Sequence, residues 1–96
     1  MKFSVIAERN LAVADKPGTW VTVRLRVPEL NESGNYTCAY EITGADFEIS
    51  RFAEGIDAFQ ALQGALIHIG AQLTRLQNEH GITLQFAGGN PGFPGT

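Results

Sequence analysis

The chain has 96 residues, a formal net charge of −3, two histidines and a single cysteine. This length supports one domain with one core and excludes a multidomain enzyme. An internal disulfide is excluded because Cys38 has no second cysteine, and two histidines with one thiol cannot alone fill the four ligand positions of a structural zinc site.

Two antiparallel strands are predicted in the first third of the chain. Residues 3–13 read as an extended segment, and Asp15-Lys16-Pro17-Gly18 then favours a tight turn, because proline fixes φ and glycine accepts a positive φ. Residues 20–27 alternate in polarity, which is typical of a strand with one buried face, and Pro28 ends the run. The expected inner face holds Val21, Val23, Leu25 and Val27, and the expected outer face holds Trp20, Thr22, Arg24 and Arg26.

The middle of the chain predicts two more strands. Residues 29–34 form a polar loop, and residues 35–43 then place Tyr36, Cys38, Tyr40 and Ile42 on one face. Gly44 marks a short turn, and residues 46–50 alternate again with Phe47 and Ile49 inward. Four strands joined in sequence by short connections indicate a meander.

One long helix follows. Apolar residues recur at steps of three and four along it, and they are Phe59, Leu62, Leu66, Ile69, Leu73 and Leu76. Asp57 stands where an N-cap belongs, Gln60 three residues later completes a capping-box pattern, and Gly81 supplies the C-terminal stop. At a rise of 1.5 Å per residue, about 24 residues span about 36 Å, enough to cross the sheet.

The C-terminal residues add a short strand and a tail. Residues 82–86 alternate, which suggests a fifth strand, and residues 88–96 are rich in glycine and proline, which suggests a flexible tail. We therefore expect one domain over residues 1–87. Its fold class is α+β, with a four- to five-stranded antiparallel meander and one long C-terminal helix packed across one face.

No residue set predicts catalysis, a metal or a cofactor. The inward phase of Cys38 predicts a buried, inert thiol, and His68 and His80 stand about three helical turns apart, too far to share a metal. Carboxylates at Glu41, Asp46 and Glu48 would lie on an open sheet face, where they act as hydrogen-bond acceptors only. We therefore expect no enzyme activity.

The charge is unevenly distributed. Residues 1–28 carry +3, residues 29–57 carry −6, and residues 58–96 are balanced. An acidic middle can attract a basic partner, although it also serves as a solvated face that keeps a small protein soluble. The candidate partner-binding residues are the carboxylates Glu41, Asp46, Glu48, Glu54 and Asp57, with Trp20 as an aromatic anchor.

The helix offers a second candidate surface. Residues 58–74 carry no lysine, arginine, aspartate or glutamate, and Gly64, Ile67 and Ala71 line up opposite the predicted core side. A helix-interior glycine costs roughly 1 kcal/mol relative to alanine, so small residues here suggest close approach by another backbone. This face, or an open sheet edge, is the candidate for pairing with a second copy of the chain.

A third candidate is single-stranded nucleic acid. Trp20 beside Arg24 and Arg26 resembles the stacking and charge that hold single strands. The chain as a whole is acidic, however, and cross-strand ion pairs between these arginines and the neighbouring carboxylates explain the pattern more simply.

The start of the helix carries a family resemblance. Residues 55–62 read Gly-Ile-Asp-Ala-Phe-Gln-Ala-Leu, which resembles a Gly-x-Asp-x-Phe-Gln-Ala-Leu segment in a family of short uncharacterised bacterial proteins. Residues 6–9, Ile-Ala-Glu-Arg, are similar to the N-terminal strand of that family. The resemblance implies no established activity and no catalytic residues.

These observations favour a non-enzymatic bacterial protein-binding module, such as a toxin-neutralising immunity protein, acting through an acidic and aromatic surface. The alternatives are a homodimerising accessory module and the nucleic-acid binder. Because the first residues are too soon interrupted by charge for a signal peptide, and no long apolar run follows, we expect a cytoplasmic protein without membrane contact.

Overall fold

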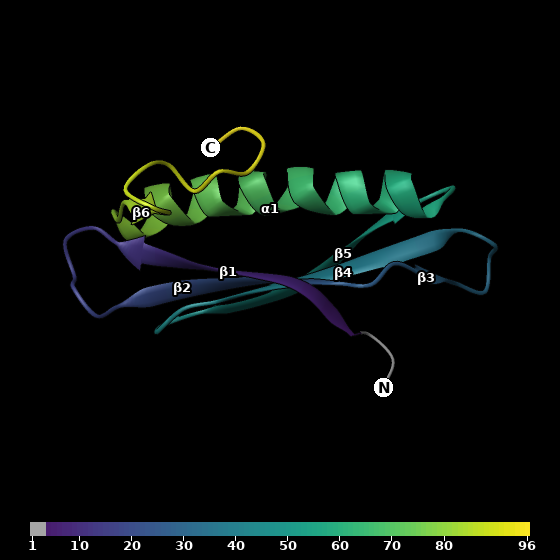
Figure 1. The fold of residues 1–96 in the computed structure, drawn as a ribbon, viewed down its shortest axis with the longest axis horizontal. Coiled ribbons are helices and arrows are strands. Elements are labelled where there is room, and N and C mark those ends of the chain that lie inside the picture. Colours follow the sequence, from purple (N-terminus) through teal and green to yellow (C-terminus); the bar gives the residue numbers. More distant parts are fainter. Residues whose placement is uncertain (1–3) are drawn as a thin grey trace.

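The computed structural model describes residues 4–96 and confirms the predicted α+β fold. Its elements within this range are β1 (Val5–Val13), β2 (Trp20–Arg26), β3 (Glu29–Leu30), β4 (Tyr36–Thr43), β5 (Glu48–Gly55), α1 (Ala58–His80) and β6 (Leu84–Gln85). The helix lies along one face of the sheet, and the opposite face is open (Figure 1). The predicted start of the first strand, Phe3, lies outside the described residues.

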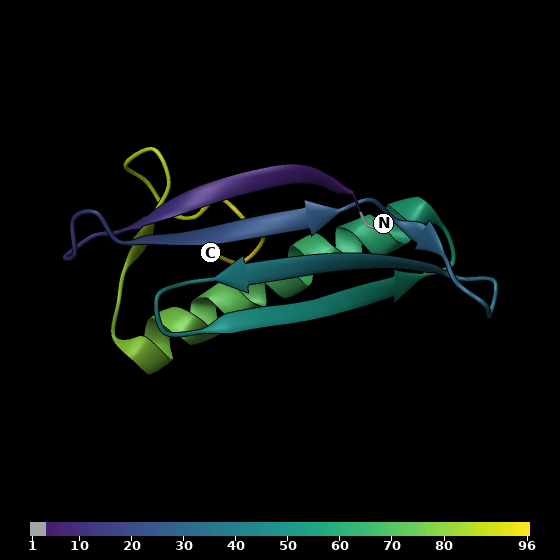
Figure 2. The same cartoon turned by 90° about the horizontal axis from the view of Figure 1, so that it is seen from below.

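The sheet is antiparallel throughout, and β1, β2, β4 and β5 follow one another as the predicted meander (Figure 2). β6 pairs with the outer edge of β1. β3 pairs with β4 on the edge that β2 also occupies, so it continues the line of β2 after Pro28 interrupts it. The prediction of a loop over residues 29–34 was therefore wrong for Glu29 and Leu30.

β5 runs further than predicted. It extends from Glu48 to Gly55, whereas the alternation suggested an end at Ser50. Arg51 occupies a position on the helix-facing side of the strand, where the alternation would require an apolar residue, so the pattern is interrupted there. Ala53 and Gly55 follow on the same side of the strand and are buried. An edge strand tolerates a charge at such a position because a long side chain reaches solvent past the edge.

The helix begins and ends where the sequence predicts. The Asp57 side chain accepts a hydrogen bond from the Gln60 backbone N–H at 2.7 Å, and the Gln60 side chain accepts one from the Ile56 N–H at 2.8 Å. At the other end, Gly81 adopts a φ of 61°, a left-handed conformation that favours glycine.

The core lies between the sheet and the helix. Alternate residues of the central strands are buried there. The alternation predicts this for Val21, Val23, Leu25, Cys38, Tyr40 and Ile42, and the structure adds Leu11 and Val13 of β1. The second half of the helix faces them with Ile69, Leu73 and Leu76.

The first half of the helix is rotated relative to the prediction. Phe59, predicted to enter the core, is 78% exposed, while Ala61 and Ala65 are fully buried. The reason is close packing: a Cβ on Gly55 would overlap the backbone nitrogen of Ala61. Where backbone meets backbone this closely, only small residues fit between them. Phe59 therefore turns outward, while Leu62 and Leu66 remain partly buried against the core.

The C-terminal segment, expected to be a flexible tail, lies against the fold in the structure. The helix crosses the sheet diagonally and leaves part of β1 without a cover, and residues 86–96 occupy that side of the helix (Figures 1 and 2). Pro91 is buried, and Phe93 packs against the core. A Cβ on Gly70 would overlap the carbonyl oxygen of Pro94, which explains why a glycine stands at this helix position.

Candidate functional site

The structure separates four of the five predicted carboxylates into two ends of the molecule, and Glu41 lies between them on β4. Asp46 and Glu48 lie at the β4–β5 turn, beside the end of the sheet where Trp20 begins β2. Glu54 and Asp57 lie at the opposite end, where β5 passes into the helix. The predicted residues therefore do not form one surface.

The centre of the outer sheet face is internally neutralised. Glu41 accepts two hydrogen bonds from Arg26, both at 2.9 Å, and this contact raises the pKa of Arg26. Arg24 pairs with Glu8 at 2.6 Å. The predicted cross-strand pairing is thus confirmed for Arg26, while Arg24 uses a carboxylate of β1 outside the predicted set. These contacts occupy the two arginines proposed to hold nucleic acid.

One end of the molecule combines acidic and apolar side chains. We call it the acidic end, and it consists of Glu29, Leu30, Glu32, Glu54, Ile56, Asp57 and Phe59. Across the sheet, Glu29 stands opposite Thr37 and Thr37 opposite Glu54, while Leu30, Tyr36 and Gly55 form the next row. Ile56, Asp57 and Phe59 follow directly at the helix start.

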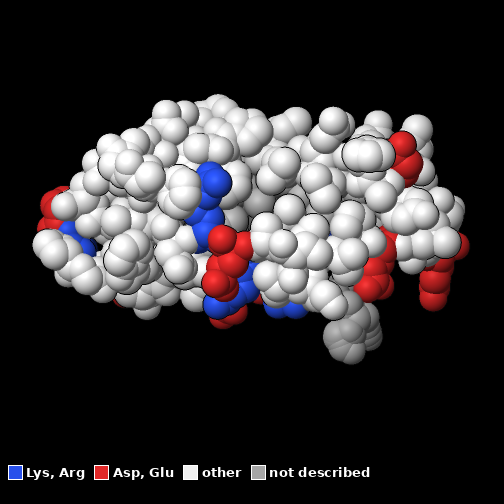
Figure 3. Space-filling model, in the orientation of Figure 1, with Lys and Arg blue, Asp and Glu red and all other residues white. Residues whose placement is uncertain are grey.

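The apolar members of the acidic end are the most exposed large apolar side chains among residues 4–96. Leu30 is 64% exposed, Ile56 75% and Phe59 78%. Red side chains gather at the right-hand end of Figure 3, where Figure 1 places β3, and no blue ones are seen there. Residues 27–37 and 52–62, which build this end, contain no lysine or arginine.

A hollow of about 410 Å³ opens at the acidic end. It is lined by Glu29, Leu30, Asn31, Glu32 and Thr37. Asn31 organises its wall: its side-chain N–H groups donate to Thr37 at 3.1 Å and Glu54 at 3.0 Å, and its side-chain oxygen accepts from the Ser33 and Asn35 backbones. The loop is therefore held in one conformation around the hollow.

The predicted dimer face is also divided. Ile67 is 58% exposed, and Ala71 is exposed. Gly64, however, turns toward β5, because a Cβ there would lie 3.2 Å from the Cβ of Ala53. Gly64 thus lets the helix approach its own sheet, and Gly70 lets the C-terminal segment approach the helix, which corrects the view that the helix glycines accommodate a partner.

A groove between α1 and β5 contains the side chains of Arg51 and Arg75. Its volume is about 460 Å³, and it is lined by Tyr40, Arg51, Phe52, His68, Ala71, Gln72 and Arg75. The Arg75 guanidinium is bound by Glu79 at 2.9 Å and by Gln72 at 2.7 Å. His68 contacts the edge of the Tyr40 ring with centroids 6.3 Å apart. These contacts tie most of the polar groups of the groove to one another.

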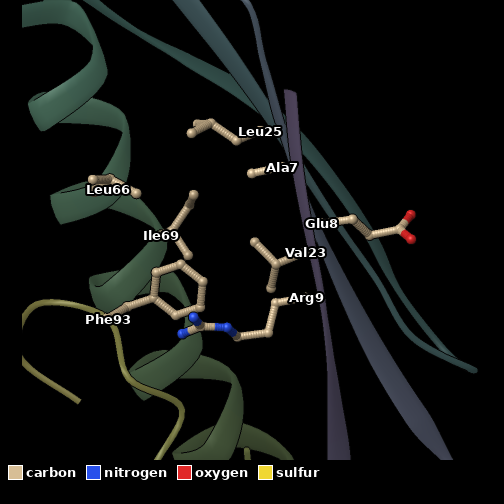
Figure 4. Close-up of a pocket in the computed structure, with 8 residues that line it drawn as sticks. All are labelled: Ala7, Glu8, Arg9, Val23, Leu25, Leu66, Ile69 and Phe93. Carbon is tan, nitrogen blue, oxygen red and sulfur yellow. The ribbon is translucent and has the colours of Figure 1, made fainter. Parts of the chain in front are cut away.

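A smaller cavity lies between β1, β2, α1 and the C-terminal segment. Its volume is about 180 Å³, and its lining residues, shown in Figure 4, are Ala7, Glu8, Arg9, Val23, Leu25, Leu66, Ile69 and Phe93. The Glu8 carboxylate points away from the cavity toward the outer sheet face. Arg9 lies at one end of the cavity beside Phe93.

Two buried titratable groups lie in the core. Cys38 is 0% exposed, and burial raises the pKa of its thiol. Burial also raises the pKa of Tyr40, against the opposing effects of a hydrogen bond with Gln72 and the charge of Arg51. A thiol that is both buried and protonated is a poor nucleophile.

Alkaline pH should therefore destabilise the protein. An unfolded thiol loses its proton near its ordinary pKa of 9.0, whereas the folded chain holds the protons of Cys38 and Tyr40 to higher pH. The unfolded state then binds fewer protons, so stability falls as pH rises above about 9, by up to about 1.4 kcal/mol per pH unit for each group. Urea unfolding between pH 8 and 10.5 measures this, and Cys38→Ala should flatten the slope; a slope that stays unchanged would contradict the role of Cys38.

Within residues 4–96, no three His, Cys, Asp or Glu side chains gather in a way that could hold a metal ion. In the same part of the chain, no helix has the length and hydropathy of a membrane span.

Comparison with known proteins places the chain in a family. The model of a domain of unknown function, DUF6968, matches residues 7–95. No curated protein and no solved structure was found to match. The match spans nearly the whole fold, from β1 through the C-terminal segment that packs on Gly70, so the helix and the segment beside it fall within one family domain. The chain belongs to the DUF6968 family.

Proposed function

We propose that this protein is a non-enzymatic binding module that captures another protein through the acidic end. The observation that carries the proposal is the coincidence of two features there. Leu30, Ile56 and Phe59 are 64–78% exposed, and the carboxylates around them have no lysine or arginine in the segments that build this end. Large apolar side chains exposed among polar groups are a feature of interaction sites.

The chemistry of this surface selects a basic partner. Carboxylates at the rim speed the encounter with a positively charged protein, and the apolar side chains supply contact area once water is displaced. Phe59 is the natural anchor, because an aromatic ring buries a large area at little entropic cost. The expected partner therefore presents apolar residues flanked by lysine or arginine.

Small size and an acidic surface with exposed apolar side chains support the class of toxin-neutralising immunity protein, acting in a bacterial cytoplasm. In this class, binding alone is the activity, since covering the surface of an enzyme blocks it. The proposal replaces Trp20, Glu41, Asp46 and Glu48 as partner contacts and keeps Glu54 and Asp57.

Charge reversal at the acidic end should weaken partner capture. Glu29 and Glu32 are chosen because neither makes a side-chain hydrogen bond among residues 4–96, so Glu29→Lys with Glu32→Lys should leave the fold intact. We expect the amount of partner captured from the native host, quantified by mass spectrometry, to fall at least tenfold. The new lysines would face the basic residues of the partner and repel them.

The matched control applies the same change of charge at the other end of the molecule. Asp46→Lys with Glu48→Lys should leave capture within twofold of the unchanged chain. Equal losses in the two double variants would show only a dependence on net charge, and an undiminished capture by the Glu29 and Glu32 variant would refute the acidic end as the binding surface.

A second candidate, pairing with another copy of the chain, is favoured by β5. This strand is eight residues long, and within residues 4–96 it pairs only with β4, so its outer edge is open to strand addition. The exposed Phe52 stands at its centre. Light scattering over a concentration series decides this: a dimer supports edge pairing, and a monomer at high micromolar concentration rejects it.

A further inference from the structure

The cavity beneath the C-terminal segment combines apolar walls with one cationic side chain. Its walls are apolar side chains of the sheet and the helix, with Ala7, Val23 and Leu25 on one side and Leu66 and Ile69 on the other (Figure 4). Arg9 is the only charged side chain that Figure 4 shows at the cavity, since Glu8 points away and pairs with Arg24 on the other face of the sheet.

Arg9 is held in place at one end of this cavity. Its guanidinium carbon lies 4.0 Å from the centroid of the Phe86 ring and 5.0 Å from that of Phe93. One of its terminal nitrogens, Nη1, donates to the carbonyl oxygens of Pro91 at 3.1 Å and Gly92 at 3.4 Å. Aromatic contacts and neutral carbonyls fix the position of the cation without cancelling its charge.

The charge of Arg9 and part of its hydrogen-bonding capacity remain available. Among residues 4–96, no carboxylate pairs with it, whereas Arg24, Arg26 and Arg75 each have one. Its hydrogen bonds to Pro91 and Gly92 use only Nη1, so within the same residues Nε and Nη2 have no hydrogen-bond acceptor. A guanidinium prefers to bind a carboxylate through two parallel N–H groups.

The volume of the cavity limits the ligand. An apolar cavity of about 150 Å³ accommodates benzene, so about 180 Å³ accepts one aromatic ring or a chain of about six carbons. We propose that this cavity binds a small apolar carboxylate, with its chain or ring between the sheet and the helix and its carboxylate on Arg9. The site is separate from the acidic end and does not depend on the function proposed there.

The position of the C-terminal segment makes it part of this site. Phe93 lines the cavity, and Pro91 and Gly92 hold the arginine that receives the carboxylate. A bound carboxylate adds an ion pair to the same guanidinium, so the ligand should also hold residues 90–96 more firmly against the helix.

Hexanoate tests the proposal, with hexanol as the probe that has the same chain and no charge. In an NMR titration of the full-length protein, hexanoate should shift the methyl signals of Leu25, Leu66 and Ile69, and it should bind at least tenfold more tightly than hexanol. Slower amide exchange in residues 90–96 should accompany binding.

Two variants separate the charge from the cavity. Arg9→Gln should weaken hexanoate binding at least tenfold and abolish the preference for hexanoate over hexanol. Because Arg9 also holds the C-terminal segment, Ala7→Leu provides an independent test: it fills the cavity without touching the guanidinium contacts and should abolish the binding of both probes. Equal affinity for hexanoate and hexanol, or hexanoate binding that survives Ala7→Leu, would overturn the proposal.

Discussion

Replacing Leu73 by alanine should lower the free energy of unfolding by about 2–5 kcal/mol, because its side chain is large and fully buried and its removal leaves a cavity. Leu73 is 0% exposed and lies in the second half of the helix, where the large apolar residues face the sheet. Equilibrium urea unfolding followed by far-UV circular dichroism measures the change.

Phe59→Ala is the matched comparison on the same helix. The apolar spacing alone puts Phe59 and Leu73 on one buried stripe, whereas the structure leaves Phe59 78% exposed. We therefore expect Phe59→Ala to change stability by less than about 0.5 kcal/mol. A loss of several kcal/mol at Phe59 would mean that the first half of the helix is not rotated as described.

Gly70→Ala should destabilise the protein by about 1–3 kcal/mol, although alanine favours a helix by about 1 kcal/mol over glycine. The new methyl group would overlap the Pro94 carbonyl oxygen, a backbone atom that moves only if the C-terminal segment moves. Thermal or urea unfolding gives the stability, and {¹H}–¹⁵N NOE values for residues 92–96 report whether the segment leaves the helix.

Two controls isolate the cause. Gly64→Ala makes the same change in the same helix, but its methyl group meets only the Ala53 side chain at 3.2 Å, so we expect a change within about 1 kcal/mol and an undisturbed C-terminal segment. In a chain that ends at Phe93, Gly70→Ala should become stabilising, because the obstructing carbonyl is gone. If the sign does not reverse, the segment does not pack on Gly70.

The features predicted correctly from the sequence are those that local chemistry decides. The helix ends follow from Asp57 and Gly81, whose capping roles depend on residues within one turn. The inward faces of β2 and β4 follow from strict alternation, since a strand has only two faces.

The features that could not be predicted depend on how the elements meet. The rotation of the helix is set by the contact of Gly55 with Ala61, which no periodicity reveals. The glycine and proline content of residues 88–96 is typical of a flexible segment. In the structure, however, Phe93 packs against the core and Arg9 donates a hydrogen bond to Pro91, and these contacts hold the segment in position. A long-range contact over more than 80 residues leaves no local signal.

Only some residues of the acidic end could be predicted, because the site also depends on how distant segments pair. Glu54 and Asp57 were named from the acidic middle of the chain, but joining them with Glu29 and Glu32 requires the pairing of β3, β4 and β5. One available signal was the run from residue 27 to 37, which holds two glutamates and no basic residue. Phe59 was missed because a helical apolar spacing was interpreted as core throughout.

The most direct test of the acidic end as a binding surface is site-specific photo-crosslinking in the native host. A photoreactive phenylalanine analogue is placed at position 59 in one variant and at position 67 in another, since Phe59 and Ile67 are both exposed apolar residues of the same helix. We predict a crosslink to a basic protein from position 59 only, lost when Glu29→Lys and Glu32→Lys are added. The same adduct from both positions, or an adduct that survives the charge reversal, would contradict the account.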